Sequence, residues 1–376
     1  MSFRATSFFI LFFFSIIKFF GPERGFSDDS FNLYQLLGLM FFLITSLVLN
    51  DRNNIHKYNL NQFLTLFFIS TVISSFLSLN FISILYSFLF LINTICIYLI
   101  FSDSTEKVID TSKFMPIVIV SLMLFQLYLY GVDILGRDVG NFEPNQFAIL
   151  ALCAIALNFF TSNNIIFRLM IAITSLFLIV ITTSRGALGA TLIFIITYFG
   201  LYIFKNYSFK KFFNYSIIFA LFIFVIFLLN FDSIKFYFNN ISLYFELTSS
   251  ERGLQSGFTG RDILWINAMD QFYSHPIFGS GLRNFDLRTH STYIMLLTET
   301  GIFGFITFFL FFVSTIYNGL LLTLNDYDDC VNVSLSYIIS MFCYAFIEKS
   351  VLLFTMPNSL LLFFFAAYIL HAQCDE

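Results

Sequence analysis

Basic and titratable residues gather in one polar stretch of an otherwise apolar chain, residues 232–290. The stretch holds five of the 19 Lys and Arg residues and two of the four His, namely Lys235, Arg252, Arg261, Arg283, Arg288, His275 and His290. Fixed positive charge next to lipid attracts anions, and histidine exchanges its proton near neutral pH. The stretch therefore predicts a loop that binds an anion or carries out chemistry, rather than one that merely joins two membrane spans.

Composition assigns the rest of the chain to a membrane. Hydrophobic residues make up 58% of the 376 residues, charged residues only 11%, and 58 residues are Phe. A soluble domain of this size could not bury so much apolar surface. Apolar runs of the length that crosses a bilayer as a helix, about 17 to 25 residues, recur instead. We therefore predict an all-α polytopic membrane protein with about 12 transmembrane helices, a single membrane domain over residues 1–376.

The predicted spans follow one another closely. They cover 5–21, 31–50, 60–79, 81–101, 114–132, 146–160, 165–182, 187–204, 212–231, 292–323, 332–347 and 351–370. No small-residue cleavage site follows the first run, so it is expected to be a retained helix. With the N-terminus inside, nine basic residues flank the spans on the inner side and four lie in short outer loops, Arg24, Arg137, Arg185 and Lys349. Basic short loops stay cytoplasmic, which predicts that both termini are cytoplasmic and that loop 232–290 is extracytoplasmic.

No metal or redox motif stands out. The five cysteines, Cys96, Cys153, Cys330, Cys343 and Cys374, form no Cys-x-x-Cys pair and are expected to be small apolar fillers. There is no His-Glu-x-x-His motif and no paired His, so we predict no cofactor and no metal. Asp28 and Asp29, on the first outer loop, are kept as an alternative, because acidic residues could hold a divalent ion there.

Several arginines fall on the predicted outer face, where the orientation rule disfavours them. Arg137, Arg185 and Arg261 each lie in a short polar segment between or beside apolar runs. One such arginine is explained by its side chain reaching lipid phosphates. Several on one face favour an anion site, because the planar guanidinium binds phosphate oxygens in pairs and stays charged near lipid.

Four segments, in order, resemble the O-antigen ligase and polymerase superfamily of bacterial envelope enzymes. GRDVGNFEPNQFA resembles its Arg-Gly-Asn-Pro-Asn-Ala element, with matches at Arg137, Gly140, Pro144, Asn145 and Ala148. TTSRGALGA resembles its Ser-Arg-Gly element, with matches at Ser184, Arg185 and Gly186. TGRDILWINAMDQFYSHPIFGSGLRNF matches a third element at Gly260, Arg261, Trp265, His275, Pro276, Gly279 and Gly281. HSTYIMLLTETGIFG matches a fourth at His290, Ser291, Gly301 and Gly304, with Ser291 where the family commonly has Asn.

The resemblance implies a metal-independent glycosyltransferase with a GT-C-like membrane fold in the bacterial inner membrane. Its donor would be a glycan on a polyprenyl diphosphate, and its acceptor a lipid-linked or lipid A core glycan. Membrane lipids and a chain-length regulator protein are the other partners it implies, and nucleic acid is not among them. Part of the active site is expected in loop 232–290. The candidate substrate-binding residues are Arg185, Arg261, Arg137, Asn145 and Arg288.

His290 is the candidate catalytic base. It precedes an apolar helix, where partial desolvation favours the neutral imidazole that can accept a proton. The alternative is a histidine that caps the helix. His275, followed by Pro276, is expected to end the preceding helix instead.

Three further features of this region have open or structural interpretations. Residues 262–274, which include Trp265, are expected to form an interfacial helix. Gly301 and Gly304 predict close helix packing. Asn145 could bind sugar hydroxyls or cap the sixth span, and the sequence does not separate these roles.

Three functions remain open at this level. A polymerase would extend a chain on a second lipid-linked unit. The richness in Phe, Ile and Asn indicates an AT-rich gene, which is typical of variable polysaccharide loci and favours this function. A ligase would transfer a finished chain to lipid A core. A lipid-linked oligosaccharide flippase or another transporter is less favoured, because no repeat of two halves is evident and charges within the spans are nearly absent.

Overall fold

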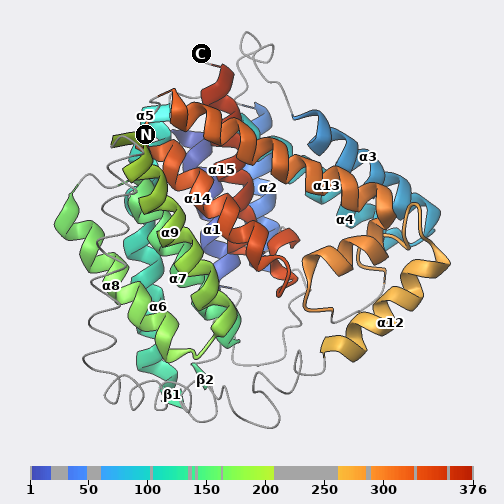
Figure 1. The fold of residues 1–376 in the computed structure, drawn as a ribbon, viewed down its shortest axis with the longest axis horizontal. Helices are drawn as coiled ribbons and strands as arrows, with labels where there is room; N and C mark the ends of the chain where they lie inside the picture. Colours follow the sequence, from blue (N-terminus) through green and yellow to red (C-terminus); the bar gives the residue numbers. More distant parts are fainter. Residues whose placement is uncertain are drawn as a thin grey trace.

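The structure is a computed structural model, and it describes residues 2–17, 33–48, 61–101, 105–133, 138–139, 143–161, 164–206, 261–284, 289–325, 328–353 and 356–374. These residues are almost all helical (Figure 1). The helices are α1 (Phe3–Ile17), α2 (Leu33–Val48), α3 (Gln62–Leu77), α4 (Phe81–Ile100), α5 (Thr105–Ser112), α6 (Met115–Tyr130), α7 (Pro144–Thr161), α8 (Ile165–Ile181), α9 (Arg185–Asn206), α12 (Arg261–Ser274), α13 (Thr292–Leu324), α14 (Asp329–Tyr344), the 3₁₀ helix η4 (Ser350–Leu352) and α15 (Pro357–Cys374). Two-residue strands β1 (Val132–Asp133) and β2 (Asp138–Val139) pair antiparallel, Val132 with Val139 and Asp133 with Asp138.

The all-α polytopic membrane fold is confirmed. Five helical segments in the described part of the chain are long and apolar enough to cross a bilayer: Phe81–Ile100, Thr105–Tyr130, Pro144–Thr161, Arg185–Lys205 and Thr292–Leu324. Shorter apolar helices cover Phe3–Ile16, Gln62–Leu77 and Ile165–Ile181. Each predicted span within the described residues falls on a helix, whereas the predicted span 212–231 lies outside them.

The structure corrects the sequence prediction at three helices. The predicted span 351–370 starts too early, because η4 and a short connection come first and α15 begins at Pro357, whose fixed φ suits a first helical position. The predicted continuous span 292–323 is kinked, because Gly301 has φ 68° and ψ −172° within α13. Helix α5 was not predicted, because its eight residues are mostly polar.

Asparagine side chains set the start of three helices. Asn61 Oδ1 accepts the backbone N–H of Phe63 at 2.9 Å, Asn80 Oδ1 that of Ile82 at 2.9 Å, and Asn164 Oδ1 that of Ile166 at 3.0 Å. Each bond satisfies a donor that the first helical turn leaves without a partner. Short polar connections thus begin α3, α4 and α8 at defined residues.

Helix α15 forms the centre of the bundle. It contacts α1, α4, α7, α13 and α14, and its residues from 357 to 370 are buried. A helix that is apolar on all sides suits the core of a protein or a membrane span, and α15 lies in the core. Its aromatic rings pack on every side: Phe364 stacks on Phe8 of α1 at 5.3 Å between centroids, and Phe363 lies 5.5 Å from Phe90 of α4.

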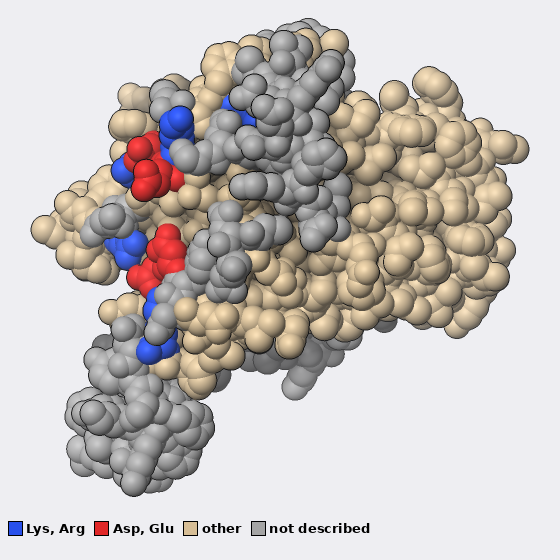
Figure 2. Space-filling view, turned by 90° about the horizontal axis from the view of Figure 1, so that it is seen from above, with Lys and Arg blue, Asp and Glu red and all other residues tan. Residues whose placement is uncertain are grey.

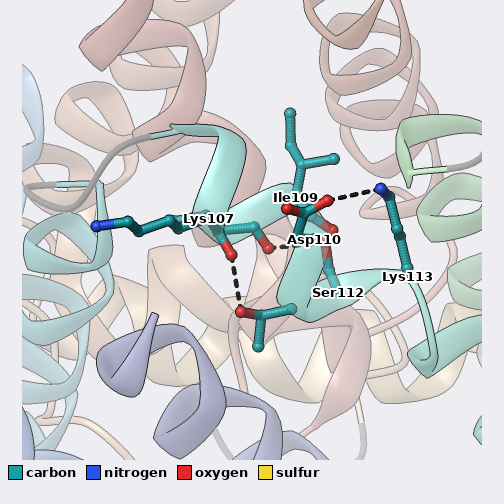
Figure 3. A network of polar contacts seen from close by, with 7 residues as sticks. Lys107, Ile109, Asp110, Ser112 and Lys113 are labelled. Atoms are coloured by element: carbon teal, nitrogen blue, oxygen red, sulfur yellow. Dashed lines mark hydrogen bonds and ion pairs between the residues drawn. The ribbon is translucent and has the colours of Figure 1, made fainter. Parts of the chain in front are cut away.

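The two ends of the bundle differ. The chain termini and α5 lie at one end, and β1 and β2 lie at the opposite end (Figure 1). Seen from above, the Lys, Arg, Asp and Glu residues gather on one part of the surface, while most of the described surface carries neither charge (Figure 2). At α5 the side chains of Lys113 and Asp110 form an exposed ion pair of 2.6 Å (Figure 3). Such a surface pair contributes little to stability, so α5 is held mainly by its buried residues.

Candidate active site

The turn formed by residues 345–349, between α14 and η4, is where the segments singled out in the sequence meet. Arg261 Nη1 donates to the carbonyl oxygen of Ile347 at 2.7 Å. Thr292 donates its backbone N–H to Ala345 O at 2.9 Å and its hydroxyl to Glu348 O at 2.7 Å. The first residue of α12 and the first residue of α13 are therefore attached to the same turn.

A chain of side chains joins this turn to α7 and α9. Asn145 Nδ2 donates to Glu348 Oε2 at 3.4 Å, and Ser184 Oγ donates to Asn145 Oδ1 at 2.8 Å. Glu348 Oε1 also accepts the backbone N–H of Lys349 at 3.1 Å. Asn145 lies in the first turn of α7, and Ser184 directly precedes α9. Both ends of the Asn145 amide are therefore engaged within the protein.

Arg185 is presented at the start of α9 by a tight local conformation. Thr183 has φ 51°, a left-handed conformation that is uncommon for a non-glycine residue, and Ser184 is buried. Gly186 lies against the same turn as Asn145, since a Cβ atom there would be 2.8 Å from Ile347 Cδ1. A Cβ atom there would require the Ile347 side chain to shift. Arg185 itself is exposed.

His290 stands just before α13 in a strained position. Its φ is 48°, in the left-handed region, and its side chain is half-buried. The N-cap residue of α13 is Ser291, so His290 does not occupy the capping position. Trp265 Nε1 donates to the carbonyl oxygen of Thr289 at 2.6 Å, which ties α12 to the residue before His290. Strain of this kind persists only where surrounding contacts hold it, and it is common at functional sites.

The loop from His275 to Gly281 holds α12 against the kink in α13. Ser280 N donates to Thr298 O at 3.0 Å and Gly281 N to Glu299 O at 2.9 Å, while Ile302 N donates back to Pro276 O at 2.9 Å. The two backbones approach so closely that a Cβ atom at Gly279 or Gly301 would collide with backbone atoms of the other segment. The glycines therefore permit contact between a loop and a kinked helix.

This finding revises the packing role predicted for the two glycines of α13. At Gly304 the helix–helix role is confirmed, because a Cβ atom there would lie 2.9 Å from Ser70 Oγ of α3. At Gly301 it is wrong, since Gly301 meets the loop at Ile277 rather than another helix.

His275 follows the last residue of α12, as predicted. It is exposed and lines a cavity of about 480 Å³ between the end of α3 and the His275–Gly281 loop. Its Nδ1 lies 2.9 Å from Ser274 Oγ. Its contacts are thus distinct from those that surround the 345–349 turn.

The other site predictions have different outcomes. Asn145, Arg185, Arg261 and His290 all lie on elements attached to the 345–349 turn, whereas Arg137 and Arg288 lie outside the described residues. Asp28 and Asp29 also lie outside them. Within the described ranges, no three His, Cys, Asp or Glu side chains are grouped so that they could hold a metal ion.

Sequence reasoning missed Glu348. It lies in the turn that follows α14 and is only 9% exposed, yet its carboxylate accepts from Asn145 of α7 and from the backbone N–H of Lys349, and its carbonyl group accepts from Thr292 of α13. The available signal was an adjacent pair of charged residues, Glu348 and Lys349, between two apolar runs. A charged side chain in such a place usually has a partner and a function.

Comparison with known proteins bears on this arrangement. Residues 170–309 match the family model described as O-antigen ligase. This segment of the chain is therefore similar to the O-antigen ligase and polymerase superfamily. The matched residues include Arg185, Arg261 and His290, while Asn145 and the 345–349 turn lie outside the match. The superfamily is a polytopic membrane family of glycosyltransferase-like enzymes. No curated protein gives a significant match.

Proposed function

We propose that this protein transfers a glycan from a polyprenyl diphosphate to a sugar hydroxyl at the outer leaflet of the bacterial inner membrane. The observation that carries the proposal is the attachment of the segments of Arg185, Arg261 and His290 to one turn. Ser184 reaches the turn through Asn145, Arg261 bonds to Ile347, and Thr292 bonds to Glu348. Two fixed cations and one proton acceptor are the groups that this transfer needs.

In the proposed reaction the acceptor hydroxyl oxygen attacks the anomeric carbon of the donor sugar. The bond between that carbon and the diphosphate oxygen breaks, and the electron pair leaves with the diphosphate. His290 takes the hydroxyl proton as general base. Arg185 and Arg261 stabilise the charge that grows on the diphosphate, because fixed guanidinium groups need no reorganisation during the reaction. Arg137 and Arg288 are further candidates for the same anion, and no metal ion is required.

We further propose that the protein is a polymerase, with a second lipid-linked repeat unit as acceptor and a chain-length regulator protein as partner. Support comes from the richness of the protein in Phe, Ile and Asn, which reflects an AT-rich gene. Such genes are typical of variable polysaccharide loci. The competing reaction is a ligase that transfers the chain to lipid A core. The two reactions share the donor chemistry and differ in the acceptor.

The test uses the purified full chain in nanodiscs with a polyprenyl diphosphate-linked glycan. Two acceptors are supplied separately, a second lipid-linked unit and lipid A core. A ladder of products with the first acceptor supports a polymerase, and a single larger product with lipid A core supports a ligase. If neither acceptor is glycosylated but the lipid-linked glycan crosses the bilayer of reconstituted vesicles, the protein is a transporter and the proposal is wrong.

A further inference from the structure

We propose that Glu348 is a positioning residue of the active site, which holds Arg185 and Arg261 in the geometry that binds the donor diphosphate. This inference rests on the proposed function. It concerns a residue outside the matched segment 170–309 and outside the four segments whose motifs carry the resemblance. Glu348 belongs to the turn to which those segments are attached.

The carboxylate of Glu348 has two defined donors. Oε2 accepts from Asn145 Nδ2 at 3.4 Å, and Oε1 accepts from the backbone N–H of Lys349 at 3.1 Å. The Asn145 contact is at the long end of the hydrogen-bond range, but the ionised carboxylate strengthens it. These bonds fix the orientation of the Asn145 amide, with Nδ2 toward the carboxylate and Oδ1 toward Ser184.

The Asn145 amide links Glu348 to the residue before Arg185, so Glu348 helps to fix where Arg185 lies. Ser184 Oγ donates to Asn145 Oδ1 at 2.8 Å, and Ser184 is the residue before Arg185. If the amide turned over, the Ser184 hydroxyl would face an NH₂ group in place of the carbonyl oxygen that now accepts its proton. The conformation at Thr183, with φ 51°, would then lose one of the contacts that support it.

Helices α12 and α13 are linked to the same turn through its backbone carbonyl groups. Arg261 Nη1 donates to Ile347 O, one residue before Glu348, and Thr292 Oγ1 donates to Glu348 O. The turn that carries the Glu348 side chain therefore also carries the carbonyl groups to which α12 and α13 are attached. Only one of the five guanidinium N–H groups of Arg261 is needed for this bond, so others can bind an anion.

Burial supports a fixed role for this side chain. Glu348 is 9% exposed, and a buried carboxylate persists only where partners compensate for the water that it has lost. Two N–H groups hold its carboxylate in place, which suits an anchor better than a group that must gain and lose a proton. Glu348 and His290 therefore have different proposed roles: Glu348 holds other groups in place, and His290 accepts the proton.

The test is a donor-binding assay with three variants, using a polyprenyl diphosphate without glycan as the probe and the full chain in nanodiscs. Glu348→Gln keeps the shape but cannot accept both bonds. Glu348→Ala removes the carboxylate, and Asn145→Ala removes the link to Ser184. Each should weaken probe binding and raise KM for the donor by about 10- to 100-fold, the effect of losing a hydrogen bond to a charged group. The value of kcat should change less, and the pH profile should keep its shape.

Two matched controls separate positioning from general damage. Glu299→Gln neutralises a second carboxylate that is also 9% exposed but lies in α13. Asn158→Ala removes a buried amide of the same helix as Asn145, one whose Nδ2 donates to Arg168 O at 3.0 Å. Both controls should bind the probe as the wild type does. The double variant of Glu348→Ala with Asn145→Ala should bind the probe as well as the single variant that binds it less tightly, because the two residues act through one chain of bonds.

Three results would overturn the inference: wild-type probe binding in both Glu348 variants, equal losses in the Glu299 control, or additive losses in the double variant. A fall in kcat with an altered acid limb of the pH profile would also overturn it, by making Glu348 a proton carrier. If Glu348→Ala folds poorly, Glu348→Gln and Asn145→Ala decide the matter. Probe binding does not depend on turnover, so failure of the proposed reaction leaves a different pattern, with intact binding in the wild type and no product.

Discussion

Replacing Gly301 by alanine should loosen α12 from α13. The residue has φ 68° and ψ −172°, a region that is almost exclusive to glycine, where another residue costs about 1–3 kcal/mol. The new Cβ atom would also collide with the Ile277 carbonyl group and break two backbone bonds, Ile302 N to Pro276 O and Phe303 N to Ile277 O. Each bond contributes about 0.5–1.5 kcal/mol, so the total loss is about 2–6 kcal/mol.

The chain carries its own probe for this change. Trp265 is the single Trp residue, and its indole N–H donates to Thr289 O across the α12–α13 contact. Its fluorescence during thermal unfolding in detergent micelles should show a lower midpoint for Gly301→Ala, and its emission should shift to the red before unfolding as α12 leaves α13.

Gly200→Ala is the matched control. Gly200 lies within α9, and a Cβ atom there would meet nothing within 4 Å. Alanine should therefore stabilise the helix by roughly 0.5–1 kcal/mol. A wild-type midpoint and unchanged emission in Gly301→Ala would refute the account of the kink.

The other predictions concern the anion site, the base and the orientation. Arg185→Ala and Arg261→Ala should abolish transfer in membranes that contain normal amounts of the protein, and Lys at either position should restore little, because it lacks the planar fork. Near-complete activity of both Lys variants would point to charge alone. His290→Ala should reduce transfer by about 10²- to 10⁴-fold with donor binding retained, whereas His275→Ala should cost much less. Wild-type transfer should fall on acidification, because a protonated imidazole accepts no proton, and an EDTA-sensitive reaction would argue against this mechanism. A Cys placed at Ser256 should react with an impermeant reagent in intact cells, and reaction only after lysis would reverse the predicted topology.

Local patterns in the sequence predict most of the helices. Apolar runs predict the spans because a helix that crosses the hydrocarbon core must be mostly apolar. The polar and aromatic segment before His275 predicts α12. The same criterion fails at residues 351–356. An apolar run of that kind reads as the start of a membrane helix, but here Ser350–Leu352 form η4 and α15 begins only at Pro357. Run length alone does not distinguish a buried turn from a span.

Long-range contacts explain why the centre of the candidate site was missed. Asn145 and Glu348 are 203 positions apart in the chain, and Arg261 and Ile347 are 86 apart. Motifs identify segments such as the one around Arg185, but they do not reveal which turn joins them. The turn contributes mainly carbonyl groups, which every residue type carries, so its sequence offers little beyond the charged pair at its end.

Together with the proposed topology, the kink at Gly301 would also set the depth of the site in the bilayer. Beyond it, residues 302–324 extend for about 35 Å at the rise of an α-helix, enough to cross a hydrocarbon core of about 30 Å. Under the proposed topology, the part of α13 before the kink would lie above the acyl chains, with its first residue up to about 13 Å from the kink. That is the level of lipid headgroups, where a carrier lipid holds its diphosphate. A donor could be used there while its polyprenyl tail stays dissolved in the membrane, so the enzyme would not have to extract it from the bilayer.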